Sequence, residues 1–349
     1  MAHNTDVPRI TDATKVWTTL ITNTAYLSGL LTLEYSLRKV GSKYPLIALY
    51  TDSFPAEGHA ALDARGILKQ RVPYLLPSVP KDYVNDVRFY DCWSKLTPFS
   101  LVEYERVVQL DSDMMILRNM DELMELELDP PALAGTGNRV FAASHACVCN
   151  PLKKPHYPPD WYEQSFFHSQ VLRGHDFPDK YSRTNAPLFR IPSNCAYTSQ
   201  HATPDVAQTE GASPTTGLGI PNGGLQVVNP SQEVYDKILA QLSSSATTNY
   251  EFADQSLLSD VFFGRWVALP YIYNALKTMR WEGIHDAIWR DESVKNMHYL
   301  LNPKPWDESE AVRSGREPRS SREAPHSWWW DITEERVKEE KARGVDDGF

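Results

Sequence analysis

The chain has 349 residues, of which 42% are hydrophobic, and its formal net charge is −10 at pH 7. This size predicts one large α/β domain, or one and a half. The acidic balance argues against a nucleic-acid partner, because binding a phosphate backbone needs a basic face. No apolar stretch approaches the ~18 residues of a membrane span, and the start lacks a signal pattern, so we expect no membrane anchor and a cytoplasmic location.

The first third of the chain has a strand–helix–strand pattern. A buried strand is predicted over residues 16–21, a helix over 26–39 and a second strand over 45–50. Such a unit forms a parallel sheet. Further on we expect a strand at 71–76, a helix at 89–104 interrupted near Pro98, a strand at 107–110 and a short helix at 121–128.

Residues 129–216 have little periodicity and many prolines and histidines, which is typical of a functional loop or an insertion. Residues 162–190 look most like an add-on. Regular structure is predicted again as a strand at 225–228 and helices at 232–242 and 254–263.

After Trp306 the chain is charged and poor in apolar runs, except for three consecutive tryptophans at 328–330. A polar helix is predicted over 333–343. We interpret 1–310 as a single domain and 311–349 as a tail that the tryptophans dock onto its surface. Stacking of these rings on carbohydrate is the alternative.

Four cysteines are present, and three of them, Cys147, Cys149 and Cys195, lie in the irregular stretch at 129–216. Cys147 and Cys149, with His145 and Cys195, offer ligands for zinc, but their spacing is not that of a common zinc motif. Small buried thiols are the simpler interpretation.

The Asp111-Ser112-Asp113 segment directly follows the apolar run at 107–110. Two carboxylates at the end of a buried strand are hard oxygen ligands for a divalent cation, at the edge where open α/β sheets bind ligands. Apolar residues follow at 114–116, and a cation would compensate carboxylates in such surroundings. A surface aspartate pair is the alternative for an Asp-x-Asp motif taken alone.

His298 precedes Lys304 by six residues in a segment that its prolines hold extended. This arrangement could place an imidazole on the metal and an ammonium group on a phosphate. A histidine satisfied within the core or at the surface is the alternative.

Seven segments in the same order resemble glycosyltransferase family 8, the group that contains glycogenin and galactinol synthase. They are Leu20-Ile21-Thr22-Asn23-Thr24-Ala25-Tyr26, Ser94-Lys95-Leu96, Asp111-Ser112-Asp113, Pro221-Asn222-Gly223-Gly224-Leu225, Phe252-Ala253-Asp254-Gln255, Leu269-Pro270-Tyr271-Ile272-Tyr273-Asn274 and the stretch from His298 to Trp306. The resemblance covers most of the chain.

The resemblance implies a GT-A fold, an α/β architecture whose mixed, mostly parallel central sheet has flanking helices. It implies Mn²⁺, with Mg²⁺ as the alternative, held by Asp111, Asp113 and His298. The nucleotide and diphosphate of a UDP-sugar would contact Leu20, Thr22, Asn23, Tyr26, Lys95, Asp111, Ser112, Asp113 and Lys304. The sugar would contact Asn222, Gly224 and Asp254.

Members of the family retain the anomeric configuration, and the resemblance makes Asp254 and Gln255 the catalytic candidates. We favour front-face attack, in which the leaving phosphate accepts the acceptor's proton, because an amide such as Gln255 is a poor nucleophile. An ordinary helix N-terminus with an acidic cap is the alternative for this pair.

Two positions depart from the family pattern: Leu301 replaces the usual glycine after the metal-binding histidine, and Gly223 replaces serine or alanine.

The donor would be UDP-glucose or UDP-galactose. Residues 275–297 contain no tyrosine, and Trp281 stands near where an acceptor tyrosine is expected. A glycogenin-like self-glucosylating enzyme therefore fits less well than a galactinol synthase-like one that uses a small polyol or carbohydrate acceptor.

The segments at 147–151 and 156–161 also resemble fungal galactinol synthase-like proteins. A nucleotidyltransferase and a non-catalytic nucleotide-sugar-binding protein are further alternatives, and a homodimer is left open.

Overall fold

The computed structural model describes residues 8–83, 87–155, 157–158, 161 and 193–349. Its centre is a seven-stranded sheet, in which the first four strands are parallel and one later strand runs antiparallel to both of its neighbours. The spatial order is β3 (Leu68–Arg71), β2 (Leu46–Tyr50), β1 (Lys15–Ile21), β4 (Arg106–Leu110), β7 (Leu225–Val228), β6 (Phe141–Ala143) and β8 (Val267–Ala268). The antiparallel strand is β7.

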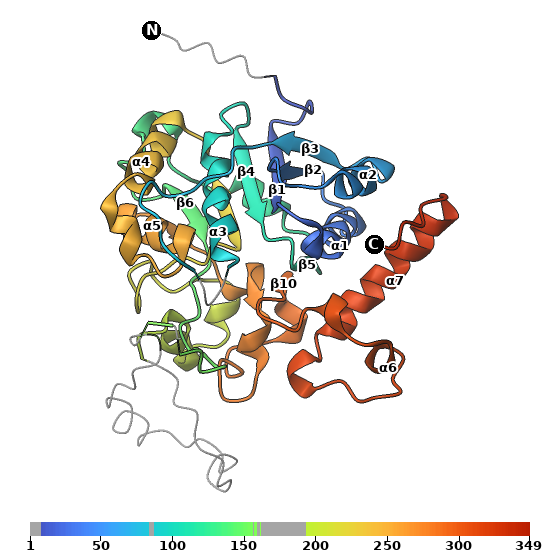
Figure 1. Cartoon of the computed structure of the whole chain (residues 1–349). Coiled ribbons are helices and arrows are strands. Elements are labelled where there is room, and N and C mark those ends of the chain that lie inside the picture. Colours follow the sequence, from blue (N-terminus) through green and yellow to red (C-terminus); the bar gives the residue numbers. More distant parts are fainter. Residues whose placement is uncertain (1–7, 84–86, 156, 159–160, 162–192) are drawn as a thin grey trace, which may run out of the picture.

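Helices cover both faces of this sheet (Figure 1). On one face lie α1 (Leu27–Lys39) and α2 (Ala56–Ala64); on the other lie α3 (Phe89–Cys92), α4 (Gln232–Leu242) and α5 (Ala253–Val261). Both faces of the strands are buried because successive side chains point to opposite sides. In β1, for example, Val16 and Trp17 are both fully buried but belong to different core clusters.

A second, three-stranded sheet stands at the carboxyl end of β4. Its strands are β5 (Met114–Ile116), β10 (Asn296–His298) and β9 (Ala275–Leu276), and β10 pairs antiparallel with β5 and parallel with β9. Because β5 follows the Asp-x-Asp segment directly, this pairing brings the end of β10 to the end of β4. Short 3-10 helices span Thr24–Tyr26, Trp93–Ser100, Asp121–Glu125, Pro131–Leu133, Ala196–Ala202, Val206–Gln208, Ser245–Asn249, Tyr271–Tyr273, Lys277–Arg280, Asp291–Ser293, Pro305–Asp307 and Ser321–Glu323.

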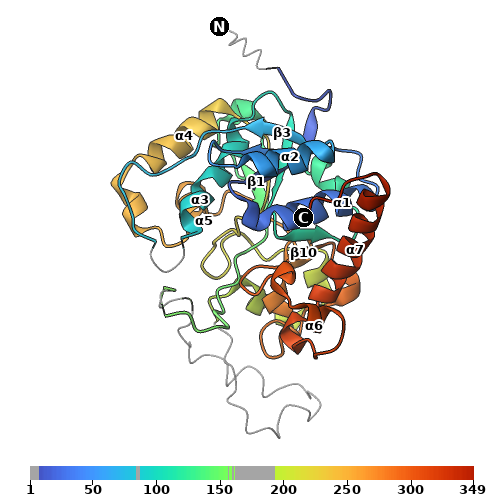
Figure 2. The same ribbon diagram turned by 45° about the vertical axis from the view of Figure 1, so that its right-hand side comes forward.

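The C-terminal segment packs along the outside of α1 (Figures 1 and 2). After the short α6 (Glu310–Arg313), α7 (His326–Ala342) lies beside α1, where the hydroxyls of Thr32 and Thr333 are 2.9 Å apart. The Trp329 side chain is 1% exposed, and its ring centroid is 5.6 Å from that of Trp306. At this position the tail is therefore joined to the rest of the chain by buried contacts.

Most predicted elements are present within two residues of their expected bounds, namely β1, α1, β2, β4, β7, α4 and α5. The strand predicted at 71–76 is wrong, because β3 ends at Arg71. The Val72 N–H still donates to Tyr50 O over 2.9 Å, but Pro73 has no N–H to continue the ladder.

Other boundaries differ from the prediction. The helix expected at 89–104 is a short α-helix followed by a 3-10 helix that ends at Ser100, and 121–128 contains only one 3-10 helix. The helix expected at 333–343 starts seven residues earlier, at His326, so it includes the three tryptophans. β6 lies in the stretch expected to be irregular. The add-on expected at 162–190 lies outside the described residues, and within the described part no helix is long and apolar enough to cross a membrane.

Candidate active site

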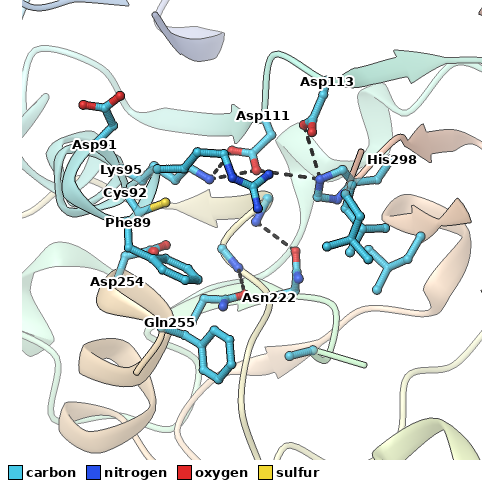
Figure 3. A pocket seen from close by; sticks show the side chains of 18 of the residues that line it. Phe89, Asp91, Cys92, Lys95, Asp111, Asp113, Asn222, Asp254, Gln255 and His298 are labelled. Carbon is cyan, nitrogen blue, oxygen red and sulfur yellow. Dashed lines mark hydrogen bonds and ion pairs between the residues drawn. The ribbon is translucent and has the colours of Figure 1, made fainter. Parts of the chain in front are cut away.

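A pocket opens at the carboxyl ends of β1 and β4, where the sequence predicted ligand binding (Figure 3). The structure brings together almost all of the predicted site residues, although they come from distant parts of the chain. The predicted residues that line the pocket are Leu20, Thr22, Asn23, Tyr26, Lys95, Asp111, Ser112, Asp113, Asn222, Gly224, Asp254, Gln255 and His298. Lys304 is not part of the lining but contacts Asp113 directly.

Asp111, Asp113 and His298 converge at one side of the pocket (Figure 3). Their ligand atoms all lie within 4.8 Å of one another. His298 Nε2 is 3.3 Å from Asp113 Oδ1 and 3.8 Å from Asp111 Oδ2. The β5–β10 pairing places His298 opposite Met114 and so produces this convergence. Two carboxylates and one imidazole are a donor set that suits Mn²⁺, and Mg²⁺ less well.

The His298 ring is oriented by Asn274, whose side-chain oxygen lies 2.8 Å from His298 Nδ1. This contact fits an N–H on Nδ1, which leaves the Nε2 lone pair facing the carboxylates. The Asn274 amide in turn donates to Asn222 Oδ1 over 2.8 Å. Asn222 Oδ1 also accepts from the Gly224 N–H at 2.9 Å. One chain of hydrogen bonds therefore links His298, a predicted metal ligand, to the predicted sugar-binding loop.

Two lysines, the half-buried Lys95 and the buried Lys304, balance the two aspartates. Lys95 Nζ is 2.6 Å from Asp111 Oδ1, and Lys304 Nζ contacts Asp113 Oδ2. Burial alone would lower the pKa of Lys95, but Asp111 outweighs it and holds that pKa well above its ordinary value. Burial would raise the pKa of Asp113, but the Lys304 ammonium group outweighs it and holds that pKa well below its ordinary value. The site is thus ionised, with paired charges.

Asp254 lies at the opposite wall, in the first turn of α5. It is 2% exposed, and burial raises its pKa to about 7, although Lys95 opposes this shift. The helix cap is Phe252, with no side-chain hydrogen bond, so the acidic-cap interpretation does not describe Asp254. Gln255 Oε1 accepts from the Gly223 N–H over 2.9 Å. Both side chains therefore face the loop at 222–224.

Gly223 departs from the family pattern for a steric reason. A Cβ built at Gly223 would lie 2.1 Å from Asp254 Oδ2, and one at Gly224 would lie 2.6 Å from His298 Cε1. Contacts this short do not occur, so the loop can approach Asp254 and His298 this closely only because both positions lack a side chain. The smaller residue at 223 thus belongs to the packing of this particular pocket.

Leu301 keeps the backbone conformation that a glycine would favour there. Its φ is +63°, in the left-handed region, and its side chain is 8% exposed. The loop that leads from His298 to Lys304 therefore does not need glycine to turn, at the expense of local strain. The departure at this position changes the side chain that lines the pocket rather than the path of the chain.

Several pocket residues were missed at the sequence level. Asp91 accepts from Thr22 Oγ1 over 2.8 Å and so supports the first predicted nucleotide-binding loop. Trp161 stacks on Phe252, with centroids 4.1 Å apart, and Tyr157 meets the same ring edge-on. The aromatic–proline run at 156–161 was noted, but only contacts across the chain could show its position. Trp281, expected near the acceptor, is instead outside the lining and packs under Arg322.

Comparison with known proteins finds galactinol synthases among the relatives of this chain. The chain is 25% identical over 332 residues to galactinol synthase 1 of Solanum lycopersicum, which covers 94% of this chain and 84% of that protein. It is 25% identical over 320 residues to galactinol synthase 7 of Arabidopsis thaliana, covering 90% and 80% of the two chains. No family model matches the chain.

Solved structures show the same fold at lower identity. The galactosyltransferase LgtC, determined in complex with donor and acceptor sugar analogues, matches with a TM-score of 0.52 at 13% identity over 92% of this chain and 96% of its own. The glycosyltransferase GlyE of Streptococcus pneumoniae matches with a TM-score of 0.50 at 16% identity. That match covers 95% of this chain but 64% of GlyE, so this chain spans less than two thirds of it. The α/β glycosyltransferase fold predicted from the sequence is confirmed.

Proposed function

Because this chain is a homologue of the galactinol synthases, within glycosyltransferase family 8, we propose that it is a retaining, Mn²⁺-dependent hexosyltransferase. Its donor is a UDP-sugar, UDP-galactose before UDP-glucose, and its acceptor is the hydroxyl of a small polyol such as inositol. The observation that carries the proposal is the convergence of Asp111, Asp113 and His298, with a lysine paired to each aspartate.

The charges of the site suit a departing diphosphate. In this proposal Asp111, Asp113 and His298 hold the cation, which when bound supplies positive charge to the diphosphate of the donor. In the structure Lys95 pairs with Asp111 and Lys304 with Asp113. In this proposal both lysines stay beside the aspartates when the donor is bound. Their ammonium groups then offset the negative charge that develops as the glycosidic bond breaks.

The nucleotide is assigned to the loop that follows β1. Leu20, Thr22, Asn23 and Tyr26 line that end of the pocket, and Thr22 is fixed by its bond to Asp91. Lys304 Nζ lies 5.4 Å from the centroid of the Tyr26 ring, so this ring connects the loop to the diphosphate region. The uracil and ribose therefore have a preformed wall, with Ser112 and Asp113 at its far end.

The hexose is assigned to the space between Asn222, Gly224 and Asp254. A carboxyl group with a pKa of about 7 is in part protonated at neutral pH, so Asp254 can donate to one sugar hydroxyl or accept from another. Gln255 already accepts from Gly223 and is a poor nucleophile. We therefore propose front-face attack, with the acceptor's proton passing to the leaving phosphate oxygen.

The division of the chain follows from the same proposal. Every residue assigned to the reaction lies within 1–310, which we propose as the catalytic domain. Residues 311–349 would then be a docked tail, held against α1 by α7 and its buried tryptophan.

A transfer assay tests the function directly. The purified protein is supplied with UDP-galactose or UDP-glucose and inositol, with Mn²⁺ or with a chelator, and released UDP and product are measured. We expect transfer from UDP-galactose that needs the cation, with the anomeric configuration of the product retained by NMR. No UDP release from either donor at any Mn²⁺ concentration would refute the transferase function. UDP release with inversion of the anomeric configuration would support a transferase function but exclude the front-face mechanism.

A further inference from the structure

A second group of potential metal ligands lies outside the reaction described above. The sulfur atoms of Cys147, Cys149 and Cys195 and a ring nitrogen of His285 all lie within 4.8 Å of one another. Cys149, Cys195 and His285 are at most 1% exposed, and Cys147 is half-buried. None of the four cysteines forms a disulfide. Three thiols and an imidazole gathered in one buried place have no role in the proposed transfer.

The separations within this group fit a single tetrahedral ion. His285 Nε2 is 3.2 Å from Cys149 Sγ and 3.4 Å from Cys195 Sγ. With Zn–S of about 2.3 Å and Zn–N of about 2.0–2.1 Å, a tetrahedral zinc separates its sulfur and nitrogen ligands by about 3.5 Å. The imidazole and the two buried thiols would therefore move by only a few tenths of an ångström.

The imidazole is held in the orientation that a metal requires. His285 Nδ1 lies 2.9 Å from His201 Nε2, so the other ring nitrogen faces the sulfurs. Metal-binding histidines commonly have their second nitrogen fixed by such a partner. His145, which the sequence offered as the ligand, points elsewhere: its Nε2 lies 3.1 Å from the carbonyl oxygens of Ala212 and Ser213. The histidine that the sequence offered beside these cysteines is therefore not part of this group, and His285 takes its place.

We propose that Cys147, Cys149, Cys195 and His285 bind one structural Zn²⁺ ion. Three thiolates and one imidazole are a soft donor set that favours zinc over Mn²⁺, so this ion differs from the one assigned to the aspartates. Four protein ligands leave no open position for water, which is the arrangement of a structural rather than a catalytic site. Binding releases the three thiol protons to solvent.

The zinc would fasten one wall of the pocket. The cysteine pair follows β6 in a stretch bound to residues 220–221, through the His145–Pro221 bridge and a 2.9 Å bond from the Ala146 N–H to Ile220 O. Cys147 itself lines the pocket. Cys195 precedes the 3-10 helix Ala196–Ala202 and is distant in sequence, as is His285. One ion would thus tie together three separate stretches, one of them beside the sugar-binding loop.

Metal content tests the proposal independently of activity. The full chain is expressed with zinc supplied, passed through a desalting column and measured by inductively coupled plasma mass spectrometry. We expect about one zinc per chain. The double variant C149S/C195S should lose it, whereas Cys92→Ser, which removes the one cysteine outside the group, should keep it. The variant Asp113→Asn should also keep it.

The wild-type protein alone can overturn the proposal, even if the double variant does not fold. Replacement of zinc by Co²⁺ should give the visible absorption of tetrahedral thiolate coordination. A wild-type chain that carries no zinc and shows no such cobalt spectrum contradicts the site. So does a mass-spectrometric finding of a disulfide between any two of the three cysteines. Zinc that is lost from Asp113→Asn but kept by C149S/C195S would assign the ion to the aspartates instead.

Discussion

Asn274 and His298 are joined by one buried hydrogen bond of 2.8 Å, and this bond determines which nitrogen of the imidazole faces the two aspartates. The carboxylates and the histidine are therefore only part of the metal site, because the ring needs a partner to hold its tautomer. The same asparagine donates to Asn222. A change at Asn274 should consequently be felt at both the metal and the sugar.

We expect Asn274→Ala to weaken Mn²⁺ affinity by about 10- to 100-fold, since partners of this kind contribute that much. The measurement is the Mn²⁺ concentration that gives half-maximal UDP release, with saturating donor. Asn249→Ala, at an exposed position, is the matched control and should leave it unchanged. An unchanged Mn²⁺ requirement in Asn274→Ala would show that the His298 ring does not need Asn274 to hold its orientation.

Asp113→Asn should abolish turnover, because the proposed cation would lower the barrier by several kcal/mol through its charge on the diphosphate, so that its loss slows the reaction at least about 100-fold. It also leaves the buried Lys304 ammonium without its charged partner, so the melting temperature should fall while the circular dichroism spectrum keeps its shape. Asp52→Asn removes an exposed ion pair and should change neither quantity. Activity with normal metal dependence in Asp113→Asn would remove this residue from the metal site.

Asp254 should make the metal-free protein less stable as pH rises. Its folded-state pKa of about 7 exceeds the ordinary 3.8, so the folded chain binds more protons between these values. The stabilising contribution is complete below about pH 4 and is lost through pH 7, by up to ~4 kcal/mol. Denaturant unfolding at several pH values should therefore show Asp254→Asn gaining on the wild type from pH 5 to 8. Parallel curves would mean that Asp254 is ionised throughout.

Leu301 offers a test of backbone strain at the position where the family pattern has glycine. Because its φ is +63°, Leu301→Gly should be more stable than Leu301→Ala by about 1 kcal/mol. At the neighbouring Leu300, whose φ is not positive, alanine should be the more stable of the two. Free energies of unfolding for the four variants decide the matter, and the same order at both positions would exclude the strain.

The docked tail should depend on one tryptophan of three. Trp329 is 1% exposed, so Trp329→Ala should cost about 3–5 kcal/mol of unfolding free energy. Trp328 and Trp330 are half-buried, and their alanine variants should cost less. Equal effects of all three substitutions would mean that the rings act as a surface cluster rather than through one buried anchor.

The sequence predicted the parts of the site that follow apolar strands. Asp111 could be found because a buried strand leads directly to it, and the carboxyl end of such a strand is where ligands bind. His298 and Lys304 were predicted from their spacing and from the family resemblance, but nothing local shows that β10 pairs with β5 and so brings them to the aspartates. Asn274 and Asp91 form hydrogen bonds with residues distant in sequence, and no periodic pattern in the sequence indicates such bonds.

The zinc group shows the same limit. Cys147 and Cys149 are close in sequence, and local spacing pointed to the nearby His145, whereas the group contains the distant His285. The strand predicted at 71–76 is wrong for a different reason. Its apolar pattern continues past Pro73, but β3 ends at Arg71 and Pro73 has no N–H for the ladder. The order of residues shows the periodicity of helices and strands, but it does not show which distant segments pair.

The β5–β10 ladder has a consequence for the order of events during synthesis. The aspartates and their histidine meet only across this ladder, so a nascent chain that has not yet produced β10 holds two ligands without the third. Manganese should then bind weakly to any partial chain and stabilise only the completed one, by an amount that grows with the logarithm of its concentration. Scarcity of the proposed ion would therefore lower the stability of the completed chain and leave partial chains unaffected.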